Sequence, residues 1–182
     1  LDVDGRVVRF DSLSKVLSAG VRFGFVTGPP PLMARLNMLH QASLLHPSGL
    51  TQAAVLALFE RWGVGDDGAT TLRSLDTHLD RVRGFYRSQC DALLAAVRRH
   101  LTSAGDGCGE SLVEYTPPTA GMFLWLRLRH VDDAFSLVSA RAVEAKVLMV
   151  PGSAFLPDGG ISQHVRLSYS TATPAELDTA ME

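Results

Sequence analysis

The sequence has few cysteines, almost no excess charge of either sign and no apolar run as long as a transmembrane helix. Cys90 and Cys108 match no metal-ligand spacing and no disulfide framework, which predicts reduced thiols in an intracellular protein, cytoplasmic or mitochondrial rather than secreted. Seventeen basic and nineteen acidic residues give a net charge of −2, so the composition gives no support to binding of nucleic acid or of a membrane surface. The six histidines form no H-E-x-x-H arrangement. We therefore predict no metal site.

The residues that are present suffice for a globular core. The chain has 182 residues, of which 46% are hydrophobic and 20% are charged. Apolar residues at helical spacing predict helices over 32–45 and 50–62, and an amphipathic helix of about 30 residues over 70–103. The helix over 50–62 is apolar on most sides, so we expect it to be buried. The longest helix could be a coiled-coil arm or a connector between two bodies.

The second half of the chain combines short strands with helices. Apolar or alternating runs predict strands over 111–115, 122–128, 147–150 and 163–170, the third of them ended by Pro151. Asp132 or Asp133 could cap a helix that reaches residue 145. Thr173 and Glu176 have the spacing of a capping box that opens a final helix. These patterns predict a compact unit of strands covered by helices.

The segment 11–24 concentrates groups that could bind an anion. Ser12 and Ser14 stand at alternate positions, Lys15 follows, and Arg22 lies seven residues further along the chain. Residues 6–10 and 21–27 have the alternation or β-branching of short strands, so the lysine is predicted to lie on a turn between them. In an extended backbone both hydroxyls point to one side, and Arg22 can return to that side from the next strand.

These groups suit a phosphate, because hydroxyls donate hydrogen bonds and a guanidinium makes a forked, charged contact. A lysine in a protected pocket beside another cation loses its proton more easily, and a neutral amine forms a Schiff base with an aldehyde. One small molecule that carries both a phosphate and an aldehyde is pyridoxal 5′-phosphate. The alternative is a basic surface loop with ordinary turn serines.

A second motif overlaps the same residues. Ser12-Leu-Ser-Lys15 matches S-x-x-K, the nucleophile motif of penicillin-binding proteins and class A β-lactamases. Those enzymes also need the strings S-D-N and K-T-G, and neither occurs in this sequence. Ser12 moreover follows a strand-like run, whereas that chemistry needs the serine at the start of a helix. We therefore reject this interpretation.

The lysine segment resembles that of class I and II aminotransferases, which have the type I pyridoxal-phosphate fold. Their pattern, S-x-S-K followed by G-x-R-x-G, stands here at residues 12–15 and 20–24. The resemblance continues in order through LHPS at 45–48, TAGMFLW at 119–125, VLMVPG at 147–152 and VRLS at 165–168. Together these motifs span nearly the whole chain and look most like the kynurenine/α-aminoadipate aminotransferase branch.

The resemblance implies an α/β fold class, the C-terminal part of a type I pyridoxal-phosphate transferase fold. Residues 1–75 would be the end of the large cofactor-binding domain, and residues 76–182 the long connecting helix and the small α+β domain. In the family the lysine motif lies well past mid-chain, and this sequence starts with Leu1 just before it. We therefore expect a piece that lacks the N-terminal half and is inactive alone. The full-length protein is expected to be a homodimer.

The resemblance also assigns roles to single residues. Lys15 would hold pyridoxal 5′-phosphate and move a proton during transfer of the amino group, while Ser12, Ser14 and Arg22 would bind its phosphate. The expected donor is 2-aminoadipate, kynurenine or a similar amino acid, and the acceptor a 2-oxo acid such as 2-oxoglutarate. The acid that pairs with the pyridine nitrogen and the ring that stacks on the cofactor come from the N-terminal half in the family, so neither is assigned.

Arg166 is the candidate for binding the substrate carboxylate. It stands in a strand otherwise made of apolar residues, where an arginine that faces inward is costly unless it is paired. A guanidinium pairs bidentately with a carboxylate, which every amino-acid substrate has. A strand arginine by itself is as readily an edge or surface residue, and it is the resemblance that assigns Arg166 to the substrate. Phe123 could contact the substrate side chain or pack in the core.

Two other functions stay open. A branched-chain or aromatic aminotransferase would share every motif above, because other residues set the choice of side chain. Some transcription regulators carry an aminotransferase-like body that senses pyridoxal phosphate without catalysis, behind a DNA-binding segment. The sequence upstream of the lysine motif would separate the regulator from the enzyme.

Overall fold

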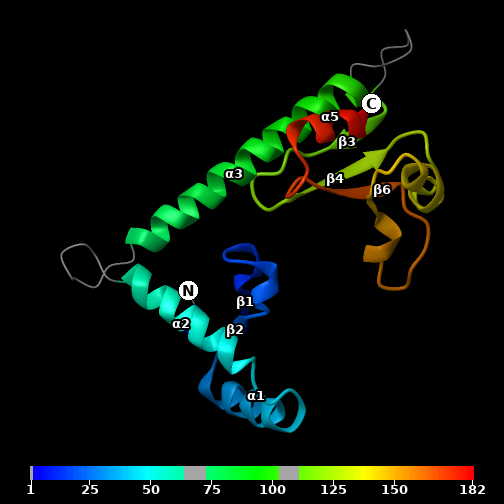
Figure 1. The fold of residues 1–182 in the computed structure, drawn as a ribbon. Helices are drawn as coiled ribbons and strands as arrows, with labels where there is room; N and C mark the ends of the chain where they lie inside the picture. The colour runs from blue at the N-terminus through cyan, green and yellow to red at the C-terminus, as the bar shows by residue number, and fades with distance from the viewer. Residues whose placement is uncertain (1, 64–72, 103–110) are drawn as a thin grey trace. The chain divides into compact units, whose positions relative to one another are not determined.

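A computed structural model of the chain describes residues 2–63, 73–102 and 111–182. It divides into two compact units, Leu1–Val82 and Arg83–Glu182. The elements of both units are labelled in Figure 1, and each unit is described by itself.

The first unit is built on a hairpin that carries the lysine segment. Strand β1 (Arg9–Ser12) pairs antiparallel with β2 (Gly24–Thr27), and Ser12 lies opposite Gly24. Two 3-10 turns, η1 (Leu13–Lys15) and η2 (Ala19–Val21), form the loop between the strands. A Cβ at Gly24 would lie 2.5 Å from the carbonyl oxygen of Asp11, so only glycine allows this close approach. The hairpin thus brings the start and the end of the lysine loop together.

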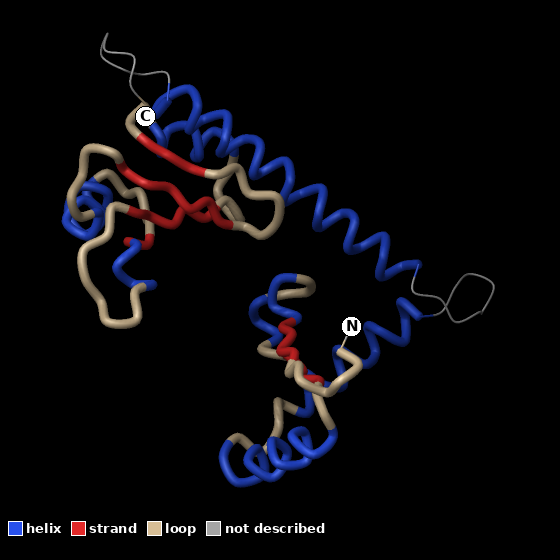
Figure 2. Tube along the Cα trace, turned by 180° about the vertical axis from the view of Figure 1, so that it is seen from behind, coloured by secondary structure: helices blue, strands red, loops and turns tan. Residues whose placement is uncertain are grey.

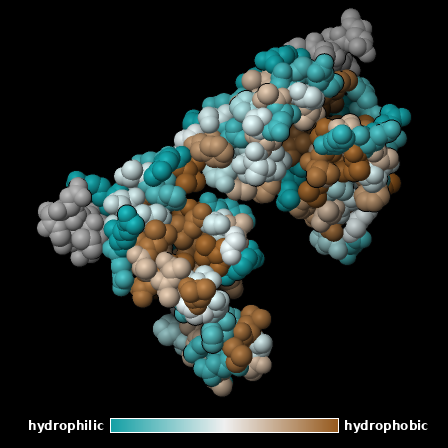
Figure 3. All heavy atoms as spheres, viewed as in Figure 1, coloured by the Kyte–Doolittle hydropathy of each residue, from teal (hydrophilic) through white to brown (hydrophobic). Residues whose placement is uncertain are grey.

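Two helices follow the hairpin, as the apolar spacing predicts. Helix α1 spans Pro30–Ser43 and begins with a proline, which suits the first helical turn because its missing N–H has no helical partner there. Helix α2 spans Gly49–Gly63. The predicted burial of this second helix is wrong: Val55 is its only buried residue, while Leu50 and Leu56 are 83% and 59% exposed. The described residues supply no surface that covers it, and Figure 3 shows apolar side chains at the surface of this unit in brown.

The second unit contains a four-stranded antiparallel sheet in the order β3-β4-β6-β5. Its strands are β3 (Val113–Tyr115), β4 (Phe123–Leu128), β5 (Val150–Pro151) and β6 (His164–Ser168). The strand predicted over 147–150 is only partly present: β5 has two residues, begins at Val150 and ends with Pro151, which was expected to stop it. An edge strand tolerates proline because it needs ladder hydrogen bonds on one side only.

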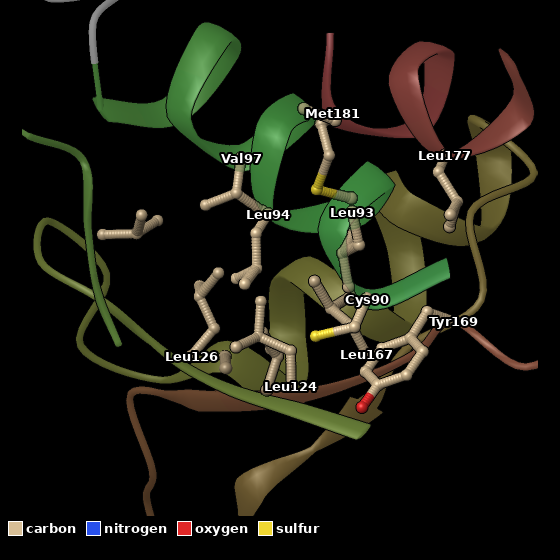
Figure 4. Close-up of a cluster of buried hydrophobic side chains, with 14 of the residues drawn as sticks. Cys90, Leu93, Leu94, Val97, Leu124, Leu126, Leu167, Tyr169, Leu177 and Met181 are labelled. Carbon is tan, nitrogen blue, oxygen red and sulfur yellow. The ribbon is translucent and has the colours of Figure 1, made fainter. Parts of the chain in front are cut away.

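The C-terminal part of helix α3 (Arg73–Val97) and helix α5 (Pro174–Met181) lie together against one face of this sheet, as Figures 1 and 2 both show. A cluster of buried side chains, drawn in Figure 4, joins the two helices to β4 and β6. Leu93 of α3, Leu124 of β4 and Val165 of β6 are each no more than 1% exposed. Burying such a side chain contributes about 1.5–3 kcal/mol relative to leaving it in water.

The long amphipathic helix is confirmed. Helix α3 has 25 residues and continues as a π-helical turn over Arg98–Thr102, while its predicted start at residue 70 lies outside the described residues. Gln89, only 6% exposed, donates to the carbonyls of Tyr169 and Ala172 over 3.1 and 2.6 Å and so ties α3 to the chain after β6. Among the described residues, no helix is both long and apolar enough to span a membrane.

The local caps of the second unit also agree with the sequence. Asp133, rather than Asp132, caps helix α4 (Ala134–Ser136) by accepting from the N–H of Phe135, and the helix continues as a π-helical turn over Leu137–Ala142. Thr173 and Glu176 form the predicted capping box at the start of α5. Cys90 is a free, buried residue in α3, as its helical pattern predicts, and Cys108 lies outside the described residues.

Candidate cofactor site

The two serines before the lysine lie side by side. Ser12 ends β1 in an extended conformation and caps η1, because its Oγ accepts a hydrogen bond from the backbone N–H of Ser14. The Ser12 hydroxyl also donates to the Ser14 hydroxyl over 2.9 Å. The prediction that both hydroxyls share one side is confirmed, but its reason was wrong. The strand ends at Ser12, and the cap of a 3-10 turn brings the hydroxyls together.

The backbone of the lysine turn is held from within the hairpin. Leu13, 9% exposed, donates its N–H to the carbonyl of Phe23 over 3.0 Å. The Leu13 carbonyl accepts from the N–H groups of Val16 and Leu17 over 3.1 and 2.8 Å. These bonds close the turn around Lys15, the last residue of η1.

The Lys15 side chain is exposed, and within the described part of the chain its ammonium forms no hydrogen bond and no ion pair. The protected pocket expected around it is therefore not formed by the described residues. The backbone of the turn is fixed while the Lys15 amine has no partner, so the amine is available to a ligand.

Arg22 has a conformation that the strand prediction over 21–27 missed. It precedes β2 in the left-handed region, with φ of 49°, which few residues other than glycine adopt. Its Nη1 donates to the carbonyl of Ala19 over 3.0 Å, and its side chain is exposed. Because Ser12 pairs with Gly24, Arg22 and the serines both lie at the loop end of the hairpin.

These residues fit a phosphate-bearing cofactor. The site supplies two adjacent hydroxyls, a guanidinium whose partner is one backbone carbonyl, and an unpaired amine on the residue that follows the second serine. A phosphate oxygen is a stronger acceptor for a guanidinium than a neutral carbonyl, since the hydrogen bond is then charged on both sides. The donor set suits a phosphate, with the amine free for an aldehyde.

Arg166 belongs to the second unit and faces away from its core. Side chains alternate along β6, so Val165 and Leu167 are buried and Arg166 lies on the opposite face of the sheet. Arg166 therefore does not face the core. The Cζ of Arg166 lies 4.2 Å from the centroid of the Phe123 ring and 5.0 Å from that of Phe155. Rings at this distance attract the cation through their negative faces. Among the described residues, no carboxylate pairs with Arg166.

An aromatic face surrounds this guanidinium. Trp125, opposite Arg166 in the sheet register, stacks on His164 with ring centroids 5.3 Å apart and meets the edge of Phe155. Phe123 lies on the same face and is 37% exposed, so it does not pack in the core. This face offers a charged fork for a carboxylate and apolar rings for the group attached to it.

Sequence reasoning missed one contact beside the lysine. The Nε2 of His78 lies 2.7 Å from the carbonyl oxygen of Val16, and the imidazole stacks on Trp62. The only signal was the position of His78 within the apolar stripe of the long helix, between Leu75 and Leu79. That spacing indicates the face of the helix and cannot indicate which distant carbonyl the ring meets.

The chain matches the family described as "Aminotransferase class I and II" over residues 2–182. It is 40% identical over 183 residues to kynurenine/alpha-aminoadipate aminotransferase, mitochondrial, of Rattus norvegicus, an alignment that covers 100% of this chain and 39% of the rat protein. The chain thus spans about two fifths of the length of this relative.

Solved structures agree with this similarity. An alpha-aminoadipate aminotransferase from Thermus thermophilus, complexed with N-(5′-phosphopyridoxyl)-L-leucine, superposes with a TM-score of 0.79 at 31% identity, over 96% of this chain and 40% of that one. A kynurenine aminotransferase from Pyrococcus horikoshii gives a TM-score of 0.78 at 27% identity, over 99% of this chain and 40% of that one. The α/β fold, expected as the C-terminal part of a type I fold, is confirmed.

Proposed function

The chain belongs to the class I and II aminotransferases, and from this we propose that it supplies the lysine and the carboxylate-binding arginine of a pyridoxal-phosphate-dependent enzyme. That enzyme transfers an amino group from an amino acid to a 2-oxo acid. The observation that carries the proposal is the Lys15 turn, where an unpaired amine follows two adjacent hydroxyls. Residues 1–75 are assigned to the large cofactor domain, and residues 76–182 to the connecting helix and small domain.

The cofactor is held by residues of the hairpin. The Ser12 and Ser14 hydroxyls and the Arg22 guanidinium bind its phosphate, and Arg22 exchanges the Ala19 carbonyl for phosphate oxygens. When bound, pyridoxal 5′-phosphate supplies an aldehyde carbon that reacts with amines and a pyridine ring that withdraws electrons.

Lys15 then has two roles in sequence. Its amine would hold the aldehyde carbon of the cofactor. Once an amino-acid substrate has taken that place, the Lys15 amine would act as general base and accept the proton of the substrate α-carbon. The backbone bonds of η1 keep this amine at a fixed point of the loop.

Arg166 orients the substrate by a forked contact with its carboxylate. The rings of Phe123, Trp125 and Phe155 on the same face favour a substrate whose side chain has apolar or aromatic surface. We assign 2-aminoadipate or kynurenine as donor, which the names of the rat and bacterial relatives support, and a 2-oxo acid such as 2-oxoglutarate as acceptor. The full-length enzyme is assigned as a homodimer.

The cofactor assignment is tested by trapping. The sequence has two lysines, Lys15 and Lys146, and both are exposed, so each acts as the control for the other. The full chain is incubated with pyridoxal 5′-phosphate and reduced with sodium borohydride, and peptide mass spectrometry then locates the label. We expect Lys15 to carry at least about tenfold more label than Lys146, because the phosphate site holds the aldehyde beside it. Equal labelling, or undiminished labelling in Lys15→Ala, would overturn the proposal.

A further inference from the structure

We infer that His78 is a positioning residue for Lys15, because its imidazole N–H holds the carbonyl of Val16, the residue directly after the lysine. This inference rests on the proposed function of Lys15. His78 lies on helix α3, 62 residues away in the sequence, and belongs to the same compact unit as the lysine turn.

The hydrogen bond has one possible direction. A carbonyl oxygen only accepts, so the Nε2 of His78, 2.7 Å away, must carry the proton. Val16 follows η1, where the last carbonyls of a helical turn lack partners within the turn. Among the described residues, His78 is the only donor to this carbonyl.

The donor is itself held in place. The imidazole of His78 stacks on Trp62 of α2 with ring centroids 4.9 Å apart and an interplanar angle of 30°. Trp62 in turn meets the edge of Phe59, with centroids 6.1 Å apart. Contacts between α2 and α3 therefore fix the direction of the His78 N–H, which points to the carbonyl of Val16.

Apart from the backbone bonds to Leu13, the loop after the turn is loosely packed on the side of α2. A cavity of about 310 Å³ is lined there by the loop residues Leu17, Ser18 and Val21 and by Leu58, Trp62 and His78. Where a cavity replaces packed side chains, the loop lacks the contacts that would limit its movement. The hydrogen bond from His78 therefore carries more of the restraint on Val16 than it would in a packed interior.

The restraint acts on the direction of the lysine side chain. Ser12 caps the turn before Lys15 and His78 holds it after Lys15, so the two bonds fix both ends of a short segment. Displacing a reacting group by about 1 Å can cost on the order of 100-fold in rate. Loss of the His78 bond thus lowers the selectivity of Lys15 for the aldehyde without removing the amine.

The test compares variants that differ at this bond. His78→Phe keeps a ring against Trp62 and loses the donor, His78→Asn is too short to reach the carbonyl, and His78→Gln keeps an amide donor of similar reach. His100→Phe is the matched control, since it removes an imidazole that bonds Asp178 over 3.0 Å in the other unit. Each full chain is treated with pyridoxal 5′-phosphate and borohydride, and the ratio of label on Lys15 to label on Lys146 is measured.

We expect His78→Phe and His78→Asn to lower this ratio by about tenfold, His78→Gln to restore most of it, and His100→Phe to leave it unchanged. A wild-type ratio near one would overturn the proposed function, and the inference with it. Far-ultraviolet circular dichroism shows which of His78→Phe and His78→Asn keeps the wild-type fold. A label ratio that stays as high in that variant as in the wild type would overturn the inference alone. Hydrogen exchange gives a second test: the Val16 and Leu17 amides, which donate to the Leu13 carbonyl, should exchange faster in His78→Phe than in the wild-type chain, and equal rates would contradict the restraint by His78.

Discussion

At the scale of single residues, Ser12 has two tasks that Ser14 does not share. Its oxygen accepts the N–H of Ser14 and so caps the lysine turn, and its hydroxyl is also one of the proposed phosphate donors. Ser14 contributes a hydroxyl alone. The two serines therefore differ in what their removal should do, although the sequence motif treats them alike.

We expect Ser12→Ala to weaken binding of pyridoxal 5′-phosphate about tenfold, and more than Ser14→Ala does, because a lost cap costs about 1 kcal/mol in addition to the lost donor. The dissociation constant is measured by equilibrium dialysis of the full chain. Ser18→Ala is the matched control, since Ser18 caps η2 by accepting from the N–H of Gly20 but is not a proposed phosphate donor. If Ser18→Ala lost as much affinity as Ser12→Ala, the effect would come from the conformation of the loop and not from a lost hydrogen bond to the phosphate.

At the scale of elements, the capping box at the start of α5 predicts that the free energy of unfolding depends on pH. Hydrogen bonds from the backbone N–H of Thr173, over 2.7 Å, and from its hydroxyl, over 2.8 Å, hold the pKa of the Glu176 carboxyl below its ordinary value of 4.5. A carboxyl whose pKa is lower in the folded state stabilises that state while it is ionised. This contribution is complete above the unfolded pKa and is lost as the pH falls through the folded pKa.

We therefore expect the free energy of unfolding of the wild-type chain to fall more steeply below about pH 4.5 than that of Glu176→Gln. The two chains should differ near neutral pH and converge in acid. Urea unfolding followed by circular dichroism across this range measures the difference. Glu144→Gln provides the comparison, because Glu144 is exposed and forms no hydrogen bond within the described ranges. Parallel curves for wild type and Glu176→Gln would contradict the role of the capping box.

At the scale of the whole molecule, the proposed machinery is divided between two units, with Lys15 in the first and Arg166 in the second. The described residues leave Lys15, Ser12 and Arg22 exposed. Closing an active site expels water, which strengthens the electrostatic interactions inside it and prevents side reactions. The chain spans 39% of the length of its rat relative, and the site that its described residues form is open to solvent.

From this we predict that the purified 182-residue chain, supplied with pyridoxal 5′-phosphate, does not form detectable glutamate from 2-aminoadipate and 2-oxoglutarate. Trapping on Lys15 should nevertheless proceed, because it needs the amine and the phosphate site alone. Lys15→Ala is the control for any background turnover. Glutamate formation by the chain that disappears in Lys15→Ala would show that these residues are already sufficient.

The sequence by itself determined the features that depend on near neighbours. The spacing of apolar residues predicted α1, α2 and the 25-residue α3, and the pair Thr173 and Glu176 predicted the start of α5. The motif around Lys15 led to the family, which the match over residues 2–182 confirms. Such features are readable because caps and periodic faces involve residues three or four positions apart.

Only the tertiary structure decided the contacts that depend on packing. It exposed most of α2, turned Arg166 away from the core onto an aromatic face, and joined the serine hydroxyls through a 3-10 turn instead of a strand. It also brought His78 to the Val16 carbonyl across 62 residues. Burial requires a partner surface, and a hydrogen bond between distant residues requires two elements in a fixed arrangement. Neither is specified by the local pattern of side chains.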